Sequence, residues 1–208
     1  MYKVRVSKGA LRNHFQYDLW KYGLGIVLTI LTWSLITTMT APQTPADKKV
    51  DIYLVGGYMM EDSAPDVEST ILASFPELME INIYNINVQA EMEYAGRQKL
   101  MAMLGSQTGD IYSFTKDEFE GMARMGAFLP LDNYDELKKH FTQEQLDEYT
   151  FATEDDPTPR LYGLPMTDIK LLGGIFFDTS NSAFGVMSYS KNSDKAVEVL
   201  QWIIENGK

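Results

Sequence analysis

The sequence predicts an α/β protein in which one transmembrane helix precedes a single lobe with a mainly parallel sheet flanked by helices. Two observations carry this prediction. Residues 22–40 are uncharged and largely apolar, and residues 49–208 alternate short β-branched segments with helical segments. This second length is enough for one domain with a sizeable core and too short for two.

The run over residues 22–40 has the properties of a membrane span. Residues 23–36 are apolar on every helical face, and a helix rising about 1.5 Å per residue needs roughly 20 such residues to cross a bilayer. Lys21 can extend toward the headgroups and Tyr22 can anchor at the interface. We therefore expect a transmembrane helix over residues 22–40. The alternative is a buried core helix.

Charge predicts the orientation of this helix. Residues 1–21 have a net charge of 5 − 1 = +4, whereas residues 41–208 have a net charge of 13 − 28 = −15. Positive flanks stay in the cytoplasm, so we expect a single-pass protein of the cell membrane with a cytoplasmic N-terminus and an extracellular C-terminal domain. A signal peptide cleaved near Ala46 is the competing interpretation. The long basic segment and the long apolar run favour an uncleaved anchor.

The two flanks of this run differ in character. Residues 1–21 form a basic juxtamembrane segment in which Leu11, Phe15, Leu19 and Trp20 recur with helical spacing. They predict either an amphipathic helix on the inner leaflet or an ordinary basic flank. Residues 41–48 contain two prolines and predict an extended linker, after which the lobe occupies residues 49–208.

The first half of the lobe repeats a strand followed by a helix three times. β-branched and alternating segments predict strands at residues 50–55, 81–88 and 110–114. Helical patterns predict helices at residues 65–75, 92–104 and 116–125, the second with Leu100, Met101, Met103 and Leu104 facing the core and the third opened by a Thr115–Glu118 capping box. This order predicts parallel strands with right-handed crossovers.

The second half of the lobe is less regular. The sequence predicts helices at residues 134–140 and 142–149, the latter with a Thr142–Gln145 capping box. Strands are expected at residues 161–165, 171–177 and 184–189. Ser193 then begins an amphipathic final helix with the apolar stripe Ala196, Val199, Leu200, Ile203 and Ile204.

The composition excludes several classes of chemistry. The chain has no cysteine, which removes disulfides, thiolate chemistry and a lipoprotein anchor. Of its two histidines only His140 lies in the lobe, so neither a Ser-His-Asp triad nor a histidine-based zinc site can form. The net charge of −11 disfavours nucleic acid, whose phosphates would be repelled.

The acidic motifs in the sequence do not indicate a metal site or an enzyme. The segment that begins at Asp178 is similar to the start of a calcium loop, but Ala183 and Tyr189 occupy its glycine and glutamate positions. The acid pairs at residues 61–62 and 155–156 suit a glycosidase in principle, yet such pairs are common on an acidic surface. We therefore expect no enzyme, no metal and no cofactor.

Several local motifs resemble the extracellular solute-binding proteins of sugar-type ABC importers. They are residues 97–104, 109–112 and 119–132, the Tyr-Gly-Leu-Pro of residues 162–165, and the Ser-Lys-Asn of residues 190–192. The resemblance implies a periplasmic-binding-protein-like fold, an ABC permease as partner and a sugar or oligosaccharide as ligand. Family members have a second lobe, but only about 18 residues separate Pro165 from Phe184, where most of it would lie. We therefore expect a single lobe.

A site in such a sheet is expected at the carboxyl ends of its strands. This rule selects as ligand-binding residues Gly57, Tyr58, Met59, Glu91, Tyr112, Phe114, Tyr162 and Met166. Aromatic faces there would stack on sugar rings while polar groups bind hydroxyls. The alternative for Tyr112 and Phe114 is packing in the core.

Two functions follow from the sequence. In the first, the chain is a membrane-anchored, solute-binding component of an ABC-type transporter, and its ligand is related to carbohydrates. The alternative is a structural or regulatory subunit. In the second case the extracellular lobe docks on a membrane complex and binds no solute. Half of a two-lobed clamp leaves a ligand exposed, whereas tight sites bury most of it, so the first function requires a partner that supplies the other wall.

Overall fold

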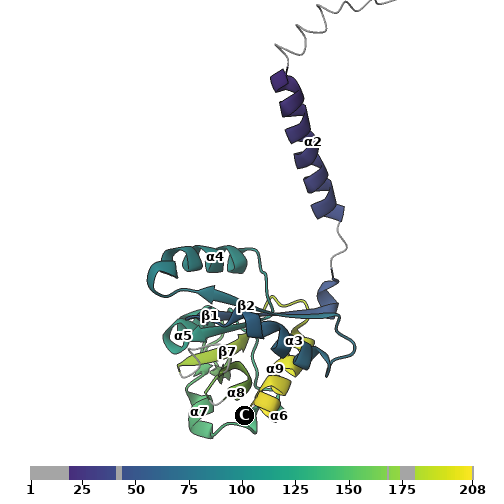
Figure 1. Cartoon of the computed structure of the whole chain (residues 1–208). Coiled ribbons are helices and arrows are strands. Elements are labelled where there is room, and N and C mark those ends of the chain that lie inside the picture. The colour runs from purple at the N-terminus through teal and green to yellow at the C-terminus, as the bar shows by residue number, and fades with distance from the viewer. Residues whose placement is uncertain (1–18, 41–43, 168, 174–180, 208) are drawn as a thin grey trace, which may run out of the picture. The chain divides into compact units, whose positions relative to one another are not determined.

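The computed structural model describes residues 19–40, 44–167, 169–173 and 181–207 (Figure 1). The chain divides into two compact units, Met1–Gln43 and Thr44–Lys208. In the first unit, residues 1–18, which include most of the expected amphipathic segment, lie outside the described residues. The second unit contains the lobe.

Helix α2 (Leu19–Thr40) is the described element of the first unit. It begins three residues before the predicted start, none of its side chains is buried, and it is long and apolar enough to cross a membrane. Its threonine hydroxyls donate to carbonyls one turn earlier, as Thr29 Oγ1 does to the Gly25 carbonyl at 2.8 Å. These polar groups are therefore satisfied within the helix and are compatible with an apolar environment.

The lobe is built on a five-stranded sheet with the order β2-β1-β3-β7-β6. Its strands are β1 (Lys49–Gly56), β2 (Glu80–Asn87), β3 (Ile111–Thr115), β6 (Leu164–Pro165) and β7 (Ser182–Val186). Strand β1 pairs in parallel with β2 and β3, whereas β7 runs antiparallel to both β3 and β6. The predicted α/β class with a mainly parallel sheet is confirmed, with β7 as the reversed strand.

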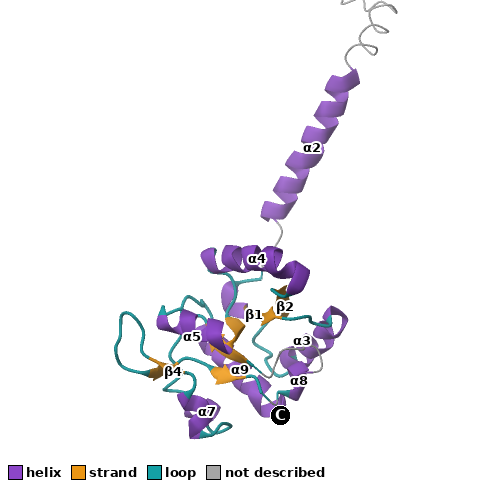
Figure 2. Cartoon of the chain, turned by 90° about the vertical axis from the view of Figure 1, so that its left-hand side faces the viewer, coloured by secondary structure: helices purple, strands orange, loops and turns teal. Residues whose placement is uncertain are grey.

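Helices cover both faces of this sheet (Figures 1 and 2). Helix α4 (Glu93–Gly105) lies on one face, and α3 (Ala64–Leu72) and α9 (Ser193–Gly207) lie on the other. This placement is what right-handed crossovers produce when the chain leaves β1 toward β2 and then returns past β1 to β3. The predicted apolar stripe of α9 is buried throughout.

Shorter elements complete the lobe. They are the 3-10 turns η1 (Ala46–Lys48), η2 (Glu61–Ser63) and η3 (Ala90–Met92), the helices α5 (Lys116–Arg124), α6 (Asp135–Lys138), α7 (Gln143–Asp147) and α8 (Lys170–Gly173), and the strand pair β4 (Thr150–Phe151) and β5 (Arg160–Leu161). The last three residues of the expected linker thus form a turn rather than an extended segment.

Stacked aromatic rings cross the centre of the sheet. Tyr84, Tyr53 and Tyr112 occupy the same register position on β2, β1 and β3. Their ring centroids are 5.0 Å apart between Tyr84 and Tyr53, and 4.8 Å apart between Tyr53 and Tyr112. Such cross-strand pairs stabilise a sheet by packing side chains on one face, so this row connects the three parallel strands.

Three local predictions are wrong. Met101 is 72% exposed, because α4 turns only Gly96 and Leu100 fully toward the sheet. The Thr115–Glu118 capping box does not form, since the Thr115 hydroxyl donates to the Glu118 carboxylate at 3.3 Å and accepts no backbone amide. Residues 171–173, the start of the strand expected at residues 171–177, belong to helix α8, and Ile169 and Leu172 are buried at a helical spacing of three.

The other capping box is confirmed. The Thr142 hydroxyl accepts from the Gln145 amide, and the Gln145 side chain accepts from the Thr142 amide at 2.9 Å. The rest of the strand expected at residues 171–177 lies outside the described residues.

Candidate functional site

The carboxyl ends of β1 and β2 bring some of the predicted site residues together. A Cβ on Gly57 would lie 3.2 Å from Oε1 of Gln89, so the segments that follow the two strands touch. Tyr58 is 62% exposed, whereas the neighbouring Met59 is 2% exposed and packs in the core. Glu91 is exposed and lines a shallow pocket with Tyr94 and other residues of η3 and α4. Tyr58 and Glu91 are therefore accessible to a ligand.

Tyr112 and Phe114 lie in the core. Neither is more than 1% exposed, and their rings stack at 5.7 Å. The Tyr112 hydroxyl donates to the Thr108 carbonyl at 2.7 Å, and the Phe128 ring packs edge-on against Phe114 at 6.1 Å. Because β3 is a central strand with both faces covered, neither ring can stack on a sugar in this conformation.

Tyr162 and Met166 are also buried, at 4% and 0% exposure. The Tyr162 amide donates to the Tyr149 carbonyl at 3.0 Å, and the Met166 amide donates to the Ser182 carbonyl at 2.9 Å. The first bond joins Tyr162 to the residue before β4, and the second joins Met166 to β7. Together with Met59, five of the eight predicted site residues therefore have buried side chains, which could contact a ligand only if the lobe rearranges.

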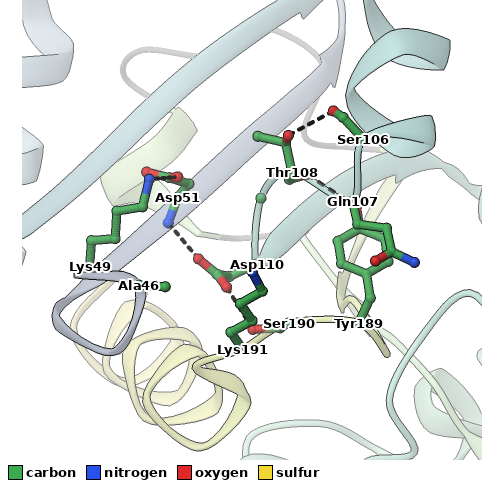
Figure 3. A pocket seen from close by; sticks show the side chains of 11 residues that line it. Ala46, Lys49, Asp51, Ser106, Gln107, Thr108, Asp110, Tyr189, Ser190 and Lys191 are labelled. Atoms are coloured by element: carbon green, nitrogen blue, oxygen red, sulfur yellow. Dashed lines mark hydrogen bonds and ion pairs between the residues drawn. The ribbon is translucent and has the colours of Figure 1, made fainter. Parts of the chain in front are cut away.

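A polar pocket of about 260 Å³ lies at the opposite edge of the sheet, at the amino ends of β1 and β3 (Figure 3). Three segments that are distant in the sequence form it, and they contribute Lys49, Asp51, Gln107, Asp110, Ser190 and Lys191. The rule that selects carboxyl ends does not select this pocket. We refer to it below as the amino-end pocket.

Two buried carboxylates form the floor of the amino-end pocket. The Asp51 carboxylate accepts from Nζ of Lys49 at 2.8 Å and from Nδ2 of Asn82 at 2.9 Å. The Asp110 carboxylate accepts from the Asp51 amide at 2.9 Å and from Oγ of Ser190 at 2.6 Å. These bonds fix the two acids relative to each other and join β1, β3 and the segment before α9.

The same contacts shift two pKa values. Burial raises the pKa of Asp110, against the opposing effect of the hydrogen bonds from Ser190 and the Asp51 amide. The hydrogen bond to Asp51 raises the pKa of Lys49, so its ammonium stays charged beside the buried acid. The floor therefore combines a fixed ammonium with two hydrogen-bonded carboxylates.

A tight turn after α4 forms the rim of the amino-end pocket. Gln107 has φ +52° and Gly109 has φ +92°, both in the left-handed region. Gly109 is required, because a Cβ there would lie 2.6 Å from the Tyr53 ring. The Thr108 carbonyl between them accepts from the hydroxyls of Tyr112 at 2.7 Å and Tyr189 at 3.1 Å. This anchoring holds the turn over the floor.

Sequence reasoning missed this pocket, although one signal pointed to it. Asp51 is a charged residue inside an otherwise apolar strand, and such a residue is buried only with partners. The pattern gave no indication that Asn82 would be a partner of this carboxylate, or that Asp110 and Ser190 would lie beside it. Among the described residues, no group of three or more His, Cys, Asp or Glu side chains is arranged to hold a metal ion.

The sequence matches no protein-family model and no curated protein. Among solved structures, the chain is similar to an extracellular solute-binding protein of family 1 from Alicyclobacillus acidocaldarius, with 14% identity and a TM-score of 0.43 over 56% of this chain and 27% of that one. It is also similar to an ABC substrate-binding protein from Listeria monocytogenes in complex with cycloalternan, with 16% identity and a TM-score of 0.37 over 55% and 28% of the two chains.

A third similar structure is the ABC transporter associated binding protein from B. animalis subsp. lactis in complex with β-1,6-galactobiose. It has 14% identity and a TM-score of 0.37 over 57% of this chain and 26% of that one. The chain therefore spans about a quarter of the length of the solved structures that it matches. They belong to the class of protein that the sequence motifs resemble.

Proposed function

We propose that this chain is a membrane-anchored extracellular component of solute-binding-protein type, associated with an ABC-type transporter, and that it recognises a carbohydrate. The length and composition of α2 and the charge difference between its flanks support the anchor and its orientation. The order of the motifs in the lobe supports the transporter context.

One observation carries the proposed recognition of a carbohydrate. Tyr58 is 62% exposed at the carboxyl end of β1, and the adjoining Gly57 lies against the side-chain amide of Gln89. An exposed aromatic ring on the residue next to this contact offers a stacking face, and the amide offers a group that binds hydroxyls. This strand-end surface, defined by Tyr58, Gln89 and Glu91, is the site that we assign to the solute.

The strand-end surface requires a second wall. Its residues Tyr58, Gln89 and Glu91 are all exposed, so the surface is open rather than enclosed, whereas tight small-molecule sites bury most of their ligand. We infer that a permease or another membrane subunit covers the solute from the other side.

The burial of most of the predicted site residues favours a second candidate function. If the solute site has been lost, the exposed side chains of Tyr58, Met92 and Tyr94 at 62%, 52% and 75% exposure form a docking surface for a membrane complex. The chain would then be a structural or regulatory subunit that binds no sugar. Tyrosine and methionine are enriched at protein interfaces.

Thermal unfolding of the full chain in nanodiscs, with and without a panel of sugars and oligosaccharides, distinguishes the two functions. A ligand at a hundred times its dissociation constant adds about 2.7 kcal/mol of stability. We expect Tyr58→Ala to abolish the shift and Met125→Ala, an exposed change on another element, to retain it. The proposed recognition of a carbohydrate is wrong if no sugar stabilises the chain while a detergent pull-down recovers a permease. A mature N-terminus near Asp47 in mass spectrometry would reject the anchor.

A further inference from the structure

The amino-end pocket retains hydrogen-bonding capacity beyond its internal network. A carboxylate offers about four lone-pair positions, and the Asp51 and Asp110 carboxylates each accept two hydrogen bonds from described residues. Above them, Gln107 and Lys191 line the pocket with exposed side chains. Within the described part of the chain, neither of these two side chains makes a hydrogen bond or ion pair. The floor can therefore accept further hydrogen bonds, and the rim can donate them.

The charges around the pocket select the class of ligand. Lys49, Lys191, Asp51 and Asp110 all line the pocket, so its lining has two ammonium groups and two carboxylates and is formally neutral. An anionic ligand would be repelled by the carboxylates, and a cationic ligand would be repelled by the ammonium groups. A neutral molecule rich in hydroxyls avoids both repulsions, because each hydroxyl can donate to a carboxylate and accept from an ammonium or an amide.

The size of the pocket limits the ligand further. Its volume of about 260 Å³ lies below the roughly 300–1,000 Å³ that is typical of pockets for drug-sized ligands. A single sugar-sized ring is therefore the largest molecule that we expect it to enclose. The Tyr189 ring, which lines the same pocket, offers an apolar contact for such a ring.

Gln107 belongs to the turn that ends α4. Its backbone lies at φ +52°, in a region that favours glycine and disfavours residues with a Cβ. This is the left-handed position of a Schellman C-cap, in which the Thr108 amide donates to the Met103 carbonyl at 3.0 Å and the Gln107 amide donates to the Leu104 carbonyl at 3.1 Å. A polar side chain is thus held over the pocket at a position where glycine would relieve the strain.

We propose that the amino-end pocket binds a neutral, polyhydroxylated molecule of about monosaccharide size. Asp51 and Asp110 accept hydrogen bonds from its hydroxyls, and Gln107 and Lys191 donate to its oxygens. This site lies at the opposite edge of the sheet from the strand-end surface, and it stands whether or not that surface binds a solute.

Isothermal titration calorimetry of the full chain in nanodiscs tests this site with three probes of equal size and different charge. They are the neutral myo-inositol, the anionic glucuronate and the cationic glucosamine. We expect myo-inositol to bind best. Lys191→Ala should weaken its binding about tenfold, which corresponds to about 1.4 kcal/mol, because it removes a charged donor. Lys139→Ala, at an exposed lysine outside the pocket, is the matched control and should leave binding unchanged.

A second variant separates binding from folding. Gln107→Gly relieves the backbone strain and removes the amide, so thermal stability should rise while myo-inositol binds more weakly. The proposal is overturned if myo-inositol does not bind, if either charged probe binds better, or if Lys191→Ala has no effect. Loss of binding in Tyr58→Ala but not in Lys191→Ala would also overturn it, and would instead support the strand-end surface of the proposed function.

Discussion

Substitution of Gly96 by alanine tests how closely α4 packs against the end of β2. A Cβ at this position would lie 1.8 Å from the carbonyl oxygen of Asn87 and 2.8 Å from its carbonyl carbon, and real Cβ atoms essentially never approach within 3.0 Å. Both contacts are to backbone, which cannot rotate away. Gly96→Ala therefore requires α4 and β2 to separate by at least 3.0 − 1.8 = 1.2 Å.

The magnitude follows from two opposing effects. Overpacking of this kind costs about 1–3 kcal/mol, and the clash with backbone places Gly96→Ala near the upper end. Alanine in a helix interior recovers about 1 kcal/mol relative to glycine. We therefore expect Gly96→Ala to lose about 2 kcal/mol and to lower the melting temperature by roughly 4–8 °C for a domain of this size.

Gly121 in α5 provides the matched control, because a Cβ there would meet nothing within 4 Å. Gly121→Ala should gain about 1 kcal/mol from helix propensity alone. Thermal unfolding of the full chain, followed by near-UV circular dichroism of the packed tyrosines, measures both variants. If Gly96→Ala melts at or above the temperature of the parent while Gly121→Ala is stabilised as expected, the close approach of α4 to β2 is refuted.

Three further predictions concern single contacts. Gln107→Gly should raise the free energy of unfolding by about 1 kcal/mol in a denaturant titration, because glycine adopts positive φ without strain; a decrease would contradict the turn geometry. Thr44→Val removes the hydroxyl that donates to the Glu80 carboxylate at 2.6 Å and is the largest cause of its lowered pKa. An NMR titration should show that pKa rising toward 4.5. A carboxylate whose pKa is lowered by folding stabilises the folded state at pH values above its pKa in the unfolded chain. This contribution is lost as the pH falls through the pKa of the folded state, so the variant, which lacks most of it, should lose less stability on acidification. Glu68→Ala removes the carboxylate that accepts from the Ile83 amide at 2.6 Å on the outer edge of β2. An uncovered edge promotes strand pairing between molecules, so sedimentation should show more association than in Glu68→Gln, which keeps an acceptor; equal association would argue against edge protection.

The role of Glu68 also shows where helix rules stop being sufficient. Its position near the start of α3 suggests an acid that complements the helix dipole. In the structure this acid reaches the adjacent strand and binds the Ile83 amide. The helix is local and was predictable, whereas the partner lies 15 residues away and follows from how β2 packs beside α3.

The accessible part of the candidate site was predictable for a similar reason. Tyr58 and Glu91 follow strands that the sequence defines clearly, and chain order places the ends of parallel strands at one edge. Tyr112 and Phe114 obey the same rule of position, yet their exposure depends on what covers the sheet. Phe128, which packs against Phe114, comes from a segment beyond α5, so no local pattern reveals that these rings are enclosed.

The sequence by itself determined the features that depend on neighbouring residues. These are the apolar helix α2, the alternation of strands and helices in the first half of the lobe, the Thr142 capping box and the apolar stripe of α9. Periodicity, capping and hydrophobicity act within one or two turns of chain, so the order of residues specifies them.

Only the tertiary structure decided the reversed direction of β7, the burial of most of the expected site and the existence of the amino-end pocket. Each depends on contacts between distant segments, as in the hydrogen bond from Ser190 to Asp110, which are 80 residues apart. Such pairings form because burial of apolar surface and satisfaction of buried polar groups are optimised over the whole lobe.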